Sequence, residues 1–193
     1  IFIVRHGETE WNKKGIFQGK LNSPLTINGI ETTRKIAKSL KGKKIQYIFS
    51  SPLTRAQETS NIIADIIHAK VIITPEFEEM DFGILDGRNI EKAKQEYKDF
   101  FSRRTEDTTY KIHTPFPQGE SYFDIHQRTN NKTHALITKY KNFAVVGHES
   151  INRIIRGTII NISLEIAVTL RQKNHEYFEI DIDSKKEQKH SIF

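Results

Sequence analysis

The sequence predicts an α/β fold, a three-layer α/β/α sandwich around a mostly parallel central sheet. Short, continuously apolar runs are typical of strands that helices cover on both faces, and stretches of helical periodicity separate these runs. Strands that alternate with helices at this spacing favour parallel pairing. At 193 residues the chain is long enough to bury one sizeable core, and we expect a single domain over 1–193.

The expected elements follow in chain order. Strands are predicted at IFIV (1–4), YIFS (47–50), VIIT (71–74), FAVVG (143–147) and HEYFEIDI (175–182). Helices are predicted at about 26–41, 53–68, 90–103, 120–141 and 150–160. Ser51 is the expected N-cap of the second helix, with Pro52 at its first position.

Two polar segments depart from this alternation. The region at about 88–118 is expected to be an insertion, and its Pro-containing part, 102–118, is predicted to be a loop near the edge of the sheet. The tail at about 183–193 contains DSKKEQKH and is expected to be solvated or frayed.

Composition restricts the class of protein. The chain has no cysteine, which excludes a disulfide scaffold, a thiolate zinc site and thiol catalysis. A net charge of +6 and a pI of about 9.4 raise the question of nucleic-acid binding. However, no aromatic residues lie between the cations of the densest basic stretch, 34–44, to stack on bases. We therefore expect a solvated helix face there, no nucleic-acid partner, and a positive field that attracts anionic substrates.

No apolar run approaches the roughly 18 residues of a membrane span, and no recognisable signal peptide precedes the first strand. We therefore expect a cytoplasmic protein without a membrane partner. The chain lacks an initiator Met, which leaves open both residues before Ile1 and a targeting signal among them. The oligomeric state also stays open, with a homodimer among the alternatives.

Groups of chemical interest follow three of the predicted strands. Arg5-His6-Gly7 follows the first, residues 51–55 (SPLTR) the second, and residues 147–150 (GHES) the fourth. In open α/β sheets, ligands bind beyond the carboxyl ends of the strands. If the strands run parallel, these segments converge on one crevice.

Two arginines and two histidines in one crevice would form an electropositive cluster, and forked guanidinium donors match phosphate oxygens. Helices that begin after the strands would add backbone N–H groups. A phosphoryl group is therefore the expected occupant. A neutral imidazole could attack its phosphorus, and a carboxylic acid of raised pKa could protonate the leaving alkoxide.

Six blocks of the chain form one ordered series. They are RHGETEWN (5–12), QGKLNSPLTINGIE (18–31), SSPLTRAQET (50–59), FEEMDFGILDG (77–87), PQGES (117–121) and VVGHES (145–150). The blocks are spread over the chain from residue 1 to about 160, and each resembles one motif of the histidine phosphatase superfamily, also called the phosphoglycerate mutase-like family.

The resemblance implies a phosphoglycerate mutase-like fold and assigns roles at matching positions. His6 would be the nucleophile and Glu79 the proton donor, with Glu78 and Asp81 as fallback candidates for the acid. Residues expected to bind the phosphoryl group are Arg5, Asn12, Arg55 and His148. Further candidates for substrate binding are Gln18, Gly19, Glu149, Arg103 and Arg104. The family requires no metal for transfer through imidazole, so we expect no metal and no other cofactor.

Each assignment has a structural alternative. His6 could cap a strand, Arg55 could pair with a surface carboxylate, and His148 could be a hydrogen-bonded core histidine. Glu79 lies among other acidic residues, so it could be surface charge. The remaining six histidines lack the spacing of metal ligands.

The blocks also depart from the family. Ile16 stands where an arginine is common, and Asn22 stands at or beside the usual aspartate, so substrate preference stays open. Ile90 occupies the place of a lysine typical of mutases, and the chain is short for a mutase. Against this, Arg103-Arg104 resembles a pair that mutases use for the substrate carboxylate.

The favoured function is a metal-independent phosphomonoester hydrolase that acts on a small-molecule phosphate ester through phosphorylated His6. The alternatives are a bisphosphoglycerate-dependent phosphoglycerate mutase and a catalytically silent module that binds phospho-ligands. The substrate is not readable. It could be a sugar phosphate, an intermediate of cobalamin synthesis, a fructose bisphosphate or a phosphoprotein.

Overall fold

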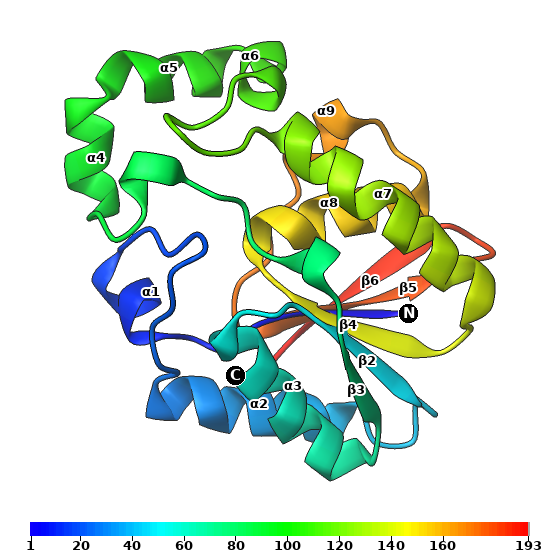
Figure 1. Ribbon diagram of the computed structural model, residues 1–193. Coiled ribbons are helices and arrows are strands. Elements are labelled where there is room, and N and C mark those ends of the chain that lie inside the picture. The colour runs from blue at the N-terminus through cyan, green and yellow to red at the C-terminus, as the bar shows by residue number, and fades with distance from the viewer. Residues whose placement is uncertain (193) are drawn as a thin grey trace.

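The computed structural model describes residues 1–192, which form a six-stranded sheet flanked by helices (Figure 1). The strand order is β3-β2-β4-β1-β5-β6. The first four strands of this order are parallel, whereas β5 is antiparallel to β1 and β6 is antiparallel to β5. The predicted α/β class with a mostly parallel sheet is therefore confirmed. The strands are β1 (Phe2–Arg5), β2 (Tyr47–Ser50), β3 (Lys70–Ile73), β4 (Phe143–Gly147), β5 (Glu176–Asp181) and β6 (Lys186–Ser191).

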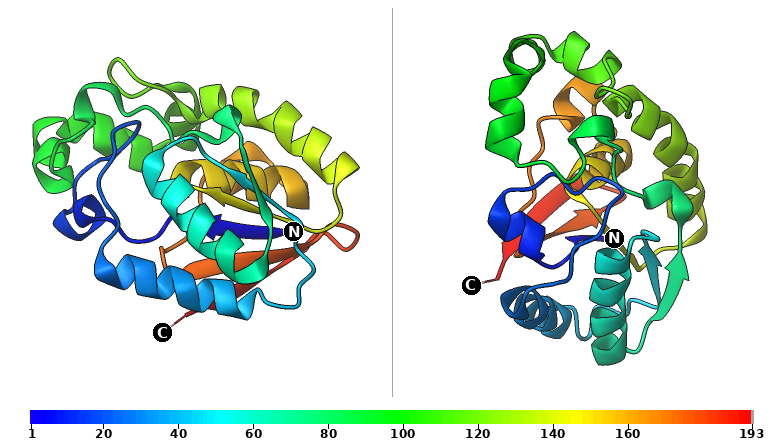
Figure 2. Two further views of the ribbon diagram at one scale, coloured as in Figure 1. Left: turned by 60° about the horizontal axis from the view of Figure 1, so that its bottom comes forward. Right: turned by 60° about the vertical axis from the view of Figure 1, so that its left-hand side comes forward.

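Helices cover both faces of the sheet (Figures 1 and 2). One face carries α2 (Ile27–Ser39) and α3 (Thr54–Ile67). The other face carries α7 (Tyr122–Lys139) and α8 (Glu149–Ile160), and α9 (Leu164–Ala167) packs against α8. Three short helices, which we call the cap, lie beyond this layer: α4 (Ile90–Glu96), α5 (Lys98–Glu106) and α6 (Thr108–His113). The remaining short elements are α1 (Glu10–Lys14), η1 (Pro75–Phe77) and η2 (Gly83–Leu85).

Side-chain alternation along the central strands explains the layers. Ile3 of β1 and Val145 of β4 pack with the apolar side chains of α7 and α8. Their neighbours Val4 and Val146 point to the opposite face and pack with α2 and α3. Because successive side chains of a strand point to opposite faces, a continuously apolar run needs a helix layer on each side.

The cap is attached through a cluster of phenyl rings. Phe116, which follows the cap, lies 4.9 Å from Phe82 and 5.5 Å from Phe100 between ring centroids. Phe17 lies 5.1 Å from Phe82 and 6.2 Å from Phe101. Aromatic pairs at such separations contribute about 0.5–1.5 kcal/mol beyond their buried area. The cap therefore has an apolar anchor of its own.

The loop prediction for 102–118 is wrong, because α5 extends to Glu106 and α6 follows at once. Asp107 caps α6 by accepting a hydrogen bond from the backbone N–H of Tyr110 at 2.9 Å. Ile112 is buried by this turn. The helix predicted at 90–103 is also divided at Tyr97, where α4 ends and α5 begins.

The polar tail is also not frayed where the structure describes it, which includes all of 183–193 except residue 193. Residues Lys186–Ser191 form β6, paired with β5 from Glu176↔Ser191 to Asp181↔Lys186. The tail forms a strand because β5 offers it an open row of backbone donors and acceptors. Such pairing needs no apolar pattern in the tail itself.

The sheet register aligns the ends of the three central strands. Arg5 of β1 pairs with Gly147 of β4, and Ser50 of β2 pairs with Val146. The segments that follow these strands are therefore neighbours, as the expected crevice requires. No helix among residues 1–192 is long and apolar enough to cross a membrane.

Candidate active site

His6 is held where β1 ends. Its backbone N–H donates to the carbonyl of Gly147 at 2.9 Å, which continues the pairing of β1 with β4 past Arg5. The side chain is buried, and its ring centroid lies 5.1 Å from that of His148. The amide of Asn174 donates to the carbonyl of His6 at 2.7 Å. The backbone of His6 is thus held at both its N–H and its carbonyl.

The hydrogen bond of the imidazole defines its tautomer. His6 Nδ1 lies 2.8 Å from the carbonyl oxygen of Gly7, which can only accept, so Nδ1 carries the proton. Nε2 then holds the free lone pair. Burial, together with the charges of Arg55 and Arg5, lowers the pKa of His6 well below its ordinary value of 6.5. The ring is therefore a neutral potential nucleophile at neutral pH.

His148 begins the turn from β4 into α8, and its ring is fully buried. Its Nε2 lies 2.7 Å from the hydroxyl of Ser51, which also accepts the N–H of Leu53 at 3.2 Å. Ser51 is thus not the N-cap of the second helix, since α3 begins at Thr54. Burial and the nearby cation of Arg55 lower the pKa of His148 well below its usual range.

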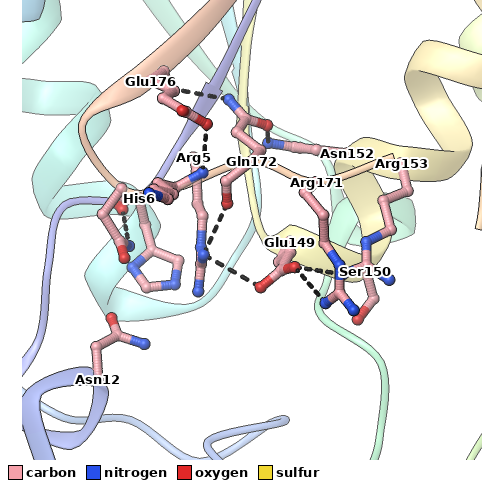
Figure 3. Close-up of polar contacts among 12 residues, drawn as sticks. Arg5, His6, Asn12, Glu149, Ser150, Asn152, Arg153, Arg171, Gln172 and Glu176 are labelled. Atoms are coloured by element: carbon pink, nitrogen blue, oxygen red, sulfur yellow. Dashed lines mark hydrogen bonds and ion pairs between the residues drawn. The ribbon is translucent and has the colours of Figure 1, made fainter. Parts of the chain in front are cut away.

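Arg5 points from the end of β1 toward the loop before β5. One of its terminal nitrogens, Nη1, donates to the carbonyl of Gln172 at 2.8 Å and lies 3.2 Å from Oε2 of Glu149 (Figure 3). Burial lowers the pKa of Arg5, and the carboxylate of Glu149 opposes that shift. Glu149 thus lies beside Arg5, and its role in substrate binding stays a prediction.

A buried pair of amides supports Arg5 from below, and sequence reasoning missed both. The Nδ2 of Asn152 donates to the carbonyl of Val4 at 3.1 Å and to Oε1 of Gln172 at 2.9 Å. The Nε2 of Gln172 donates to the carbonyls of Ile3 and Glu176. Their importance arises from contacts between segments far apart in the chain, which no local pattern signals.

Arg55 lies on the first turn of α3 with 1% of its surface exposed. Its Nη2 donates to the carbonyl of Gly19 at 2.7 Å, and its Nη1 donates to the carbonyl of Leu21 at 2.6 Å. Nη1 also donates to Oδ1 of Asn22 at 3.2 Å. Burial lowers the pKa of Arg55 to about 10. No carboxylate among residues 1–192 forms an ion pair with this buried cation, so an anion would stabilise it.

Glu79 is buried beside these cations. Its Oε1 accepts the N–H of Met80 at 2.8 Å, and its Oε2 lies 3.4 Å from the N–H of Ser150 at the start of α8. Burial raises the pKa of Glu79 above its ordinary value, although Arg55 and Arg5 oppose the rise. A carboxyl group with a raised pKa can donate a proton near neutral pH.

The fallback acids differ from Glu79 in their surroundings. Glu78 and Asp81 are partly exposed and lie 3.7 and 3.6 Å from the ammonium of Lys20. Asp81 also accepts the N–H of Gly83 at 2.7 Å. Both fallback residues therefore make solvated structural contacts, and burial distinguishes Glu79 from them.

Asn12, Gln18 and Gly19 lie on the α1 side of the crevice. Figure 3 shows the amide of Asn12 directed toward His6, while its Oδ1 accepts the N–H of Thr9 at 3.1 Å. Gln18 is buried. Gly19 has φ +45°, and a Cβ there would lie 2.0 Å from a carboxylate oxygen of Asp86. A side chain at position 19 would be strained by this positive φ and would have to displace the carboxylate of Asp86.

Arg103 and Arg104 do not face the crevice. Arg104 is buried, donates to the carbonyl of Thr114 at 2.6 Å and stacks on Phe116 at 4.4 Å. Arg103 is exposed and lies 4.3 Å from the ring centroid of Tyr110. Both arginines therefore make contacts within the cap and its junction, and their expected role toward substrate has no support in these contacts.

The two titration shifts act together. With ordinary pKa values near 6.5 and 4.5, a neutral imidazole and a protonated carboxyl group would hardly coexist at any pH. Lowering the pKa of His6 and raising that of Glu79 widens the range in which they do, which is how sites combine a base or nucleophile with an acid. No group of three or more His, Cys, Asp or Glu side chains within 1–192 is placed to hold a metal ion.

Known proteins resemble this chain in sequence and in fold. The model of the histidine phosphatase superfamily (branch 1) matches residues 1–192. A protein of Hydrogenobacter thermophilus named "Putative phosphoserine phosphatase 2" is 29% identical over 187 residues, covering 96% of this chain and 91% of that protein. "Probable phosphoglycerate mutase GpmB" of Photorhabdus laumondii is also 29% identical over 187 residues, with coverages of 94% and 84%. The crystal structure of "a putative alpha-ribazole-5'-P phosphatase" of Escherichia coli has a TM-score of 0.79 at 26% identity, covering 99% of this chain and 94% of that one.

Proposed function

The chain belongs to the histidine phosphatase superfamily, and on that premise we propose that it hydrolyses phosphate monoesters through a phosphohistidine on His6. The observation that carries the proposal is the pairing of a buried, neutral His6 with a buried Glu79 of raised pKa at an electropositive sheet edge. Phosphatases are among the relatives, and the family membership supports a phosphatase or a mutase.

In the first step, Nε2 of His6 attacks phosphorus while the bond from phosphorus to the ester oxygen breaks. Nδ1–H of His6 stays bonded to Gly7, and the developing imidazolium charge is stabilised by the phosphoryl anion. Arg5, Arg55 and Asn12 hold the phosphoryl oxygens. The proton of Glu79 moves to the leaving oxygen, and the product alcohol departs.

His148 supplies a further donor. Because the Ser51 hydroxyl already accepts the N–H of Leu53, its own proton can be donated to Nε2 of His148. That arrangement leaves the proton of the neutral ring on Nδ1, where it can stabilise charge on the phosphoryl oxygens in the transition state.

In the second step, water replaces the alcohol. The Glu79 carboxylate accepts a proton from this water as its oxygen attacks phosphorus, and the bond from phosphorus to Nε2 breaks. Inorganic phosphate leaves, neutral His6 is restored, and Glu79 again carries its proton. No step requires a metal ion.

The test is release of phosphate from p-nitrophenyl phosphate in the presence of EDTA, together with acid-quench trapping of phosphate on the protein. We expect turnover with EDTA and an acid-labile phosphoprotein, both lost in His6→Ala. Undiminished turnover by His6→Ala, or activity that depends on added metal, would overturn the proposal. Tight binding of phosphate without any phosphoprotein would instead favour the catalytically silent module.

A phosphoglycerate mutase is the second candidate, because a relative of nearly full coverage is named as one. The same phosphohistidine would then transfer its group to a second phosphoglycerate instead of water. This candidate predicts exchange between 2- and 3-phosphoglycerate, stimulated by the bisphosphate, with little free phosphate. Release of inorganic phosphate alone would reject it.

A further inference from the structure

A group of cations continues from Arg5 toward the cap, with Glu149 at its centre. Oε2 of Glu149 lies 3.2 Å from Nη1 of Arg5, while Oε1 accepts a hydrogen bond from Arg153 and lies 3.3 Å from Nη1 of Arg171. Figure 3 shows Arg5 on one side of this carboxylate and the other two arginines on the opposite side. Three guanidinium groups therefore share one carboxylate.

A fourth cation reaches the group from α6 of the cap. The ammonium of Lys111 donates to the carbonyl oxygen of Val168 at 3.3 Å, and Arg153 donates to the same oxygen at 3.1 Å. Arg153 also donates to the hydroxyl of Tyr122 at 2.8 Å. One carbonyl oxygen thus holds the charged ends of Lys111 and Arg153 close together.

The positive charges of this group exceed the negative ones. Lys111, Arg153 and Arg171 contribute three positive charges, and Glu149, shared with Arg5, contributes the single carboxylate. No carboxylate within residues 1–192 forms an ion pair with Lys111. Burial, and then the charges of Arg153 and Arg171, lower the pKa of Lys111 to about 8. Like charges held together in this way are stabilised when an anion binds among them.

We propose that Lys111, Arg153 and Arg171 form a second anion site and that the substrate is a phosphate monoester with a second anionic group. This inference rests on the proposed function, in which Arg5 and its neighbours bind the reacting phosphoryl group. A single carboxylate separates Arg5 from Arg171, so the second anion lies only a few bonds from the ester oxygen. A carboxylate and a second phosphate both have the required chemistry.

The three cations of the proposed second anion site differ in how accessible they are to a ligand. The side chain of Arg171 is 77% exposed, and that of Lys111 is partly buried, so both can contact a ligand directly. Arg153 is buried and is held by Glu149 and Tyr122. It contributes charge from beneath the site and positions Glu149, whereas Arg171 and Lys111 select the ligand.

The experiment measures kcat/KM for phosphate release from two matched pairs of esters. Glycerol 3-phosphate and 3-phosphoglycerate differ by a carboxylate, and fructose 6-phosphate and fructose 1,6-bisphosphate differ by a phosphate. We expect the partner that carries the second anionic group to be preferred in at least one pair by about tenfold or more, the scale of one charge-assisted hydrogen bond. The pair that shows the preference identifies the anion.

Arg171→Gln and Lys111→Gln should each bring the ratio of kcat/KM values within that pair closer to one. Lys98→Gln is the matched control, since it removes an exposed cap lysine outside the group and should retain the preference. Equal kcat/KM values within both pairs in the unmodified protein would overturn the inference. A loss that is equal for both members of a pair would do so too, because it would show a structural role only.

Binding measurements distinguish failure of the proposed function from failure of the second anion site. The His6→Ala protein can be titrated calorimetrically with 3-phosphoglycerate and with glycerol 3-phosphate. If none of the esters is hydrolysed, the proposed function fails, while tighter binding of the carboxylate ligand, lost in Arg171→Gln, would still support the second anion site. Equal affinities for the two ligands would reject that site.

Discussion

The carboxyl ends of the central strands and the cap position their charged groups in different ways. At the strand ends, His6 and His148 are buried, and their rings are held by the carbonyl of Gly7 and the hydroxyl of Ser51, respectively. In the cap, Lys111 and Arg103 come from helices of six and nine residues, which are attached through a small cluster of phenyl rings. Under the proposed function, the strand ends would hold the reacting groups, while the cap would contribute Lys111 to the choice of ester.

The largest expected effect tests the candidate active site at the strand ends. Glu79→Gln keeps the size of the side chain but removes its transferable proton, so kcat should fall by about 10²- to 10⁴-fold for alkyl phosphates. The fall should be much smaller for p-nitrophenyl phosphate, because its leaving group is stable as an anion. Steady-state rates with both esters provide the measurement, and an equal loss with both would contradict the role of Glu79 as acid.

The pH profile sharpens the same point. The pKa of His6 is lowered by burial, so kcat/KM should fall only when the pH drops below that depressed value and the imidazole becomes charged. The pKa of Glu79 is raised, so kcat/KM should fall again as the pH rises through that value and the proton is lost. In Glu79→Gln the alkaline limb should disappear, and persistence of that limb would assign it to another group.

A third prediction concerns the junction between the candidate active site and the cap. Gly83 has φ +57°, and a Cβ there would lie 2.0 Å from the carbonyl oxygen of Pro117, just after the cap. Gly83→Ala should therefore lower the free energy of unfolding by about 2–4 kcal/mol, since both backbone strain and the steric conflict contribute. Urea denaturation measures this change.

Gly42→Ala is the matched control for that substitution. Gly42 also has a positive φ, +80°, but a Cβ there would meet no atom within 4 Å. Its cost should be limited to the backbone term of about 1 kcal/mol. Equal losses in the two variants would show that the packing of Gly83 against the 117–119 turn does not matter.

The smallest expected effect lies within the cap. Arg104→Gln loses the bond to Thr114 and the stacking on Phe116, and should cost about 1–3 kcal/mol of unfolding free energy. Its exposed neighbour Arg103 only stacks on Tyr110, so Arg103→Gln should cost about 0.5–1 kcal/mol. Thermal denaturation measures the stability of both variants. A larger loss of stability for Arg103→Gln than for Arg104→Gln would contradict the structural role given to Arg104.

The sequence predicts the central strands well, because a strand covered on both faces must be continuously apolar. The predicted runs 47–50 and 143–147 coincide with β2 and β4, and the run 1–4 differs from β1 by one residue. By contrast, β6 and α6 are polar and form through pairing with β5 and through the cap of Asp107, respectively. Neither contact leaves a periodic signal in the chain.

The residues of the candidate site also differ in how well the sequence predicts them. His6 and His148 follow strand ends directly, and Arg55 lies on the first turn of the helix after β2, so chain direction alone brings them to the same end of the sheet. Gln172 comes from the loop before β5 and supports Arg5 through contacts across nearly the whole chain. Paired arginines at 103–104 had a family precedent, yet the fold of α5 buries one of them and exposes the other. Local motifs identify groups on strand ends better than groups on helices whose packing is specific to this chain.

The strand β6 has a further consequence, for the behaviour of the protein in concentrated solution. An edge strand presents unpaired backbone groups that can recruit a strand of another chain and start aggregation. Here the edge strand is KEQKHS, and lysines such as Lys186 and Lys189 place charge along it. Desolvating these ammonium groups opposes strand addition. The same polar composition that hid β6 in the sequence thus protects this edge of the sheet from self-association.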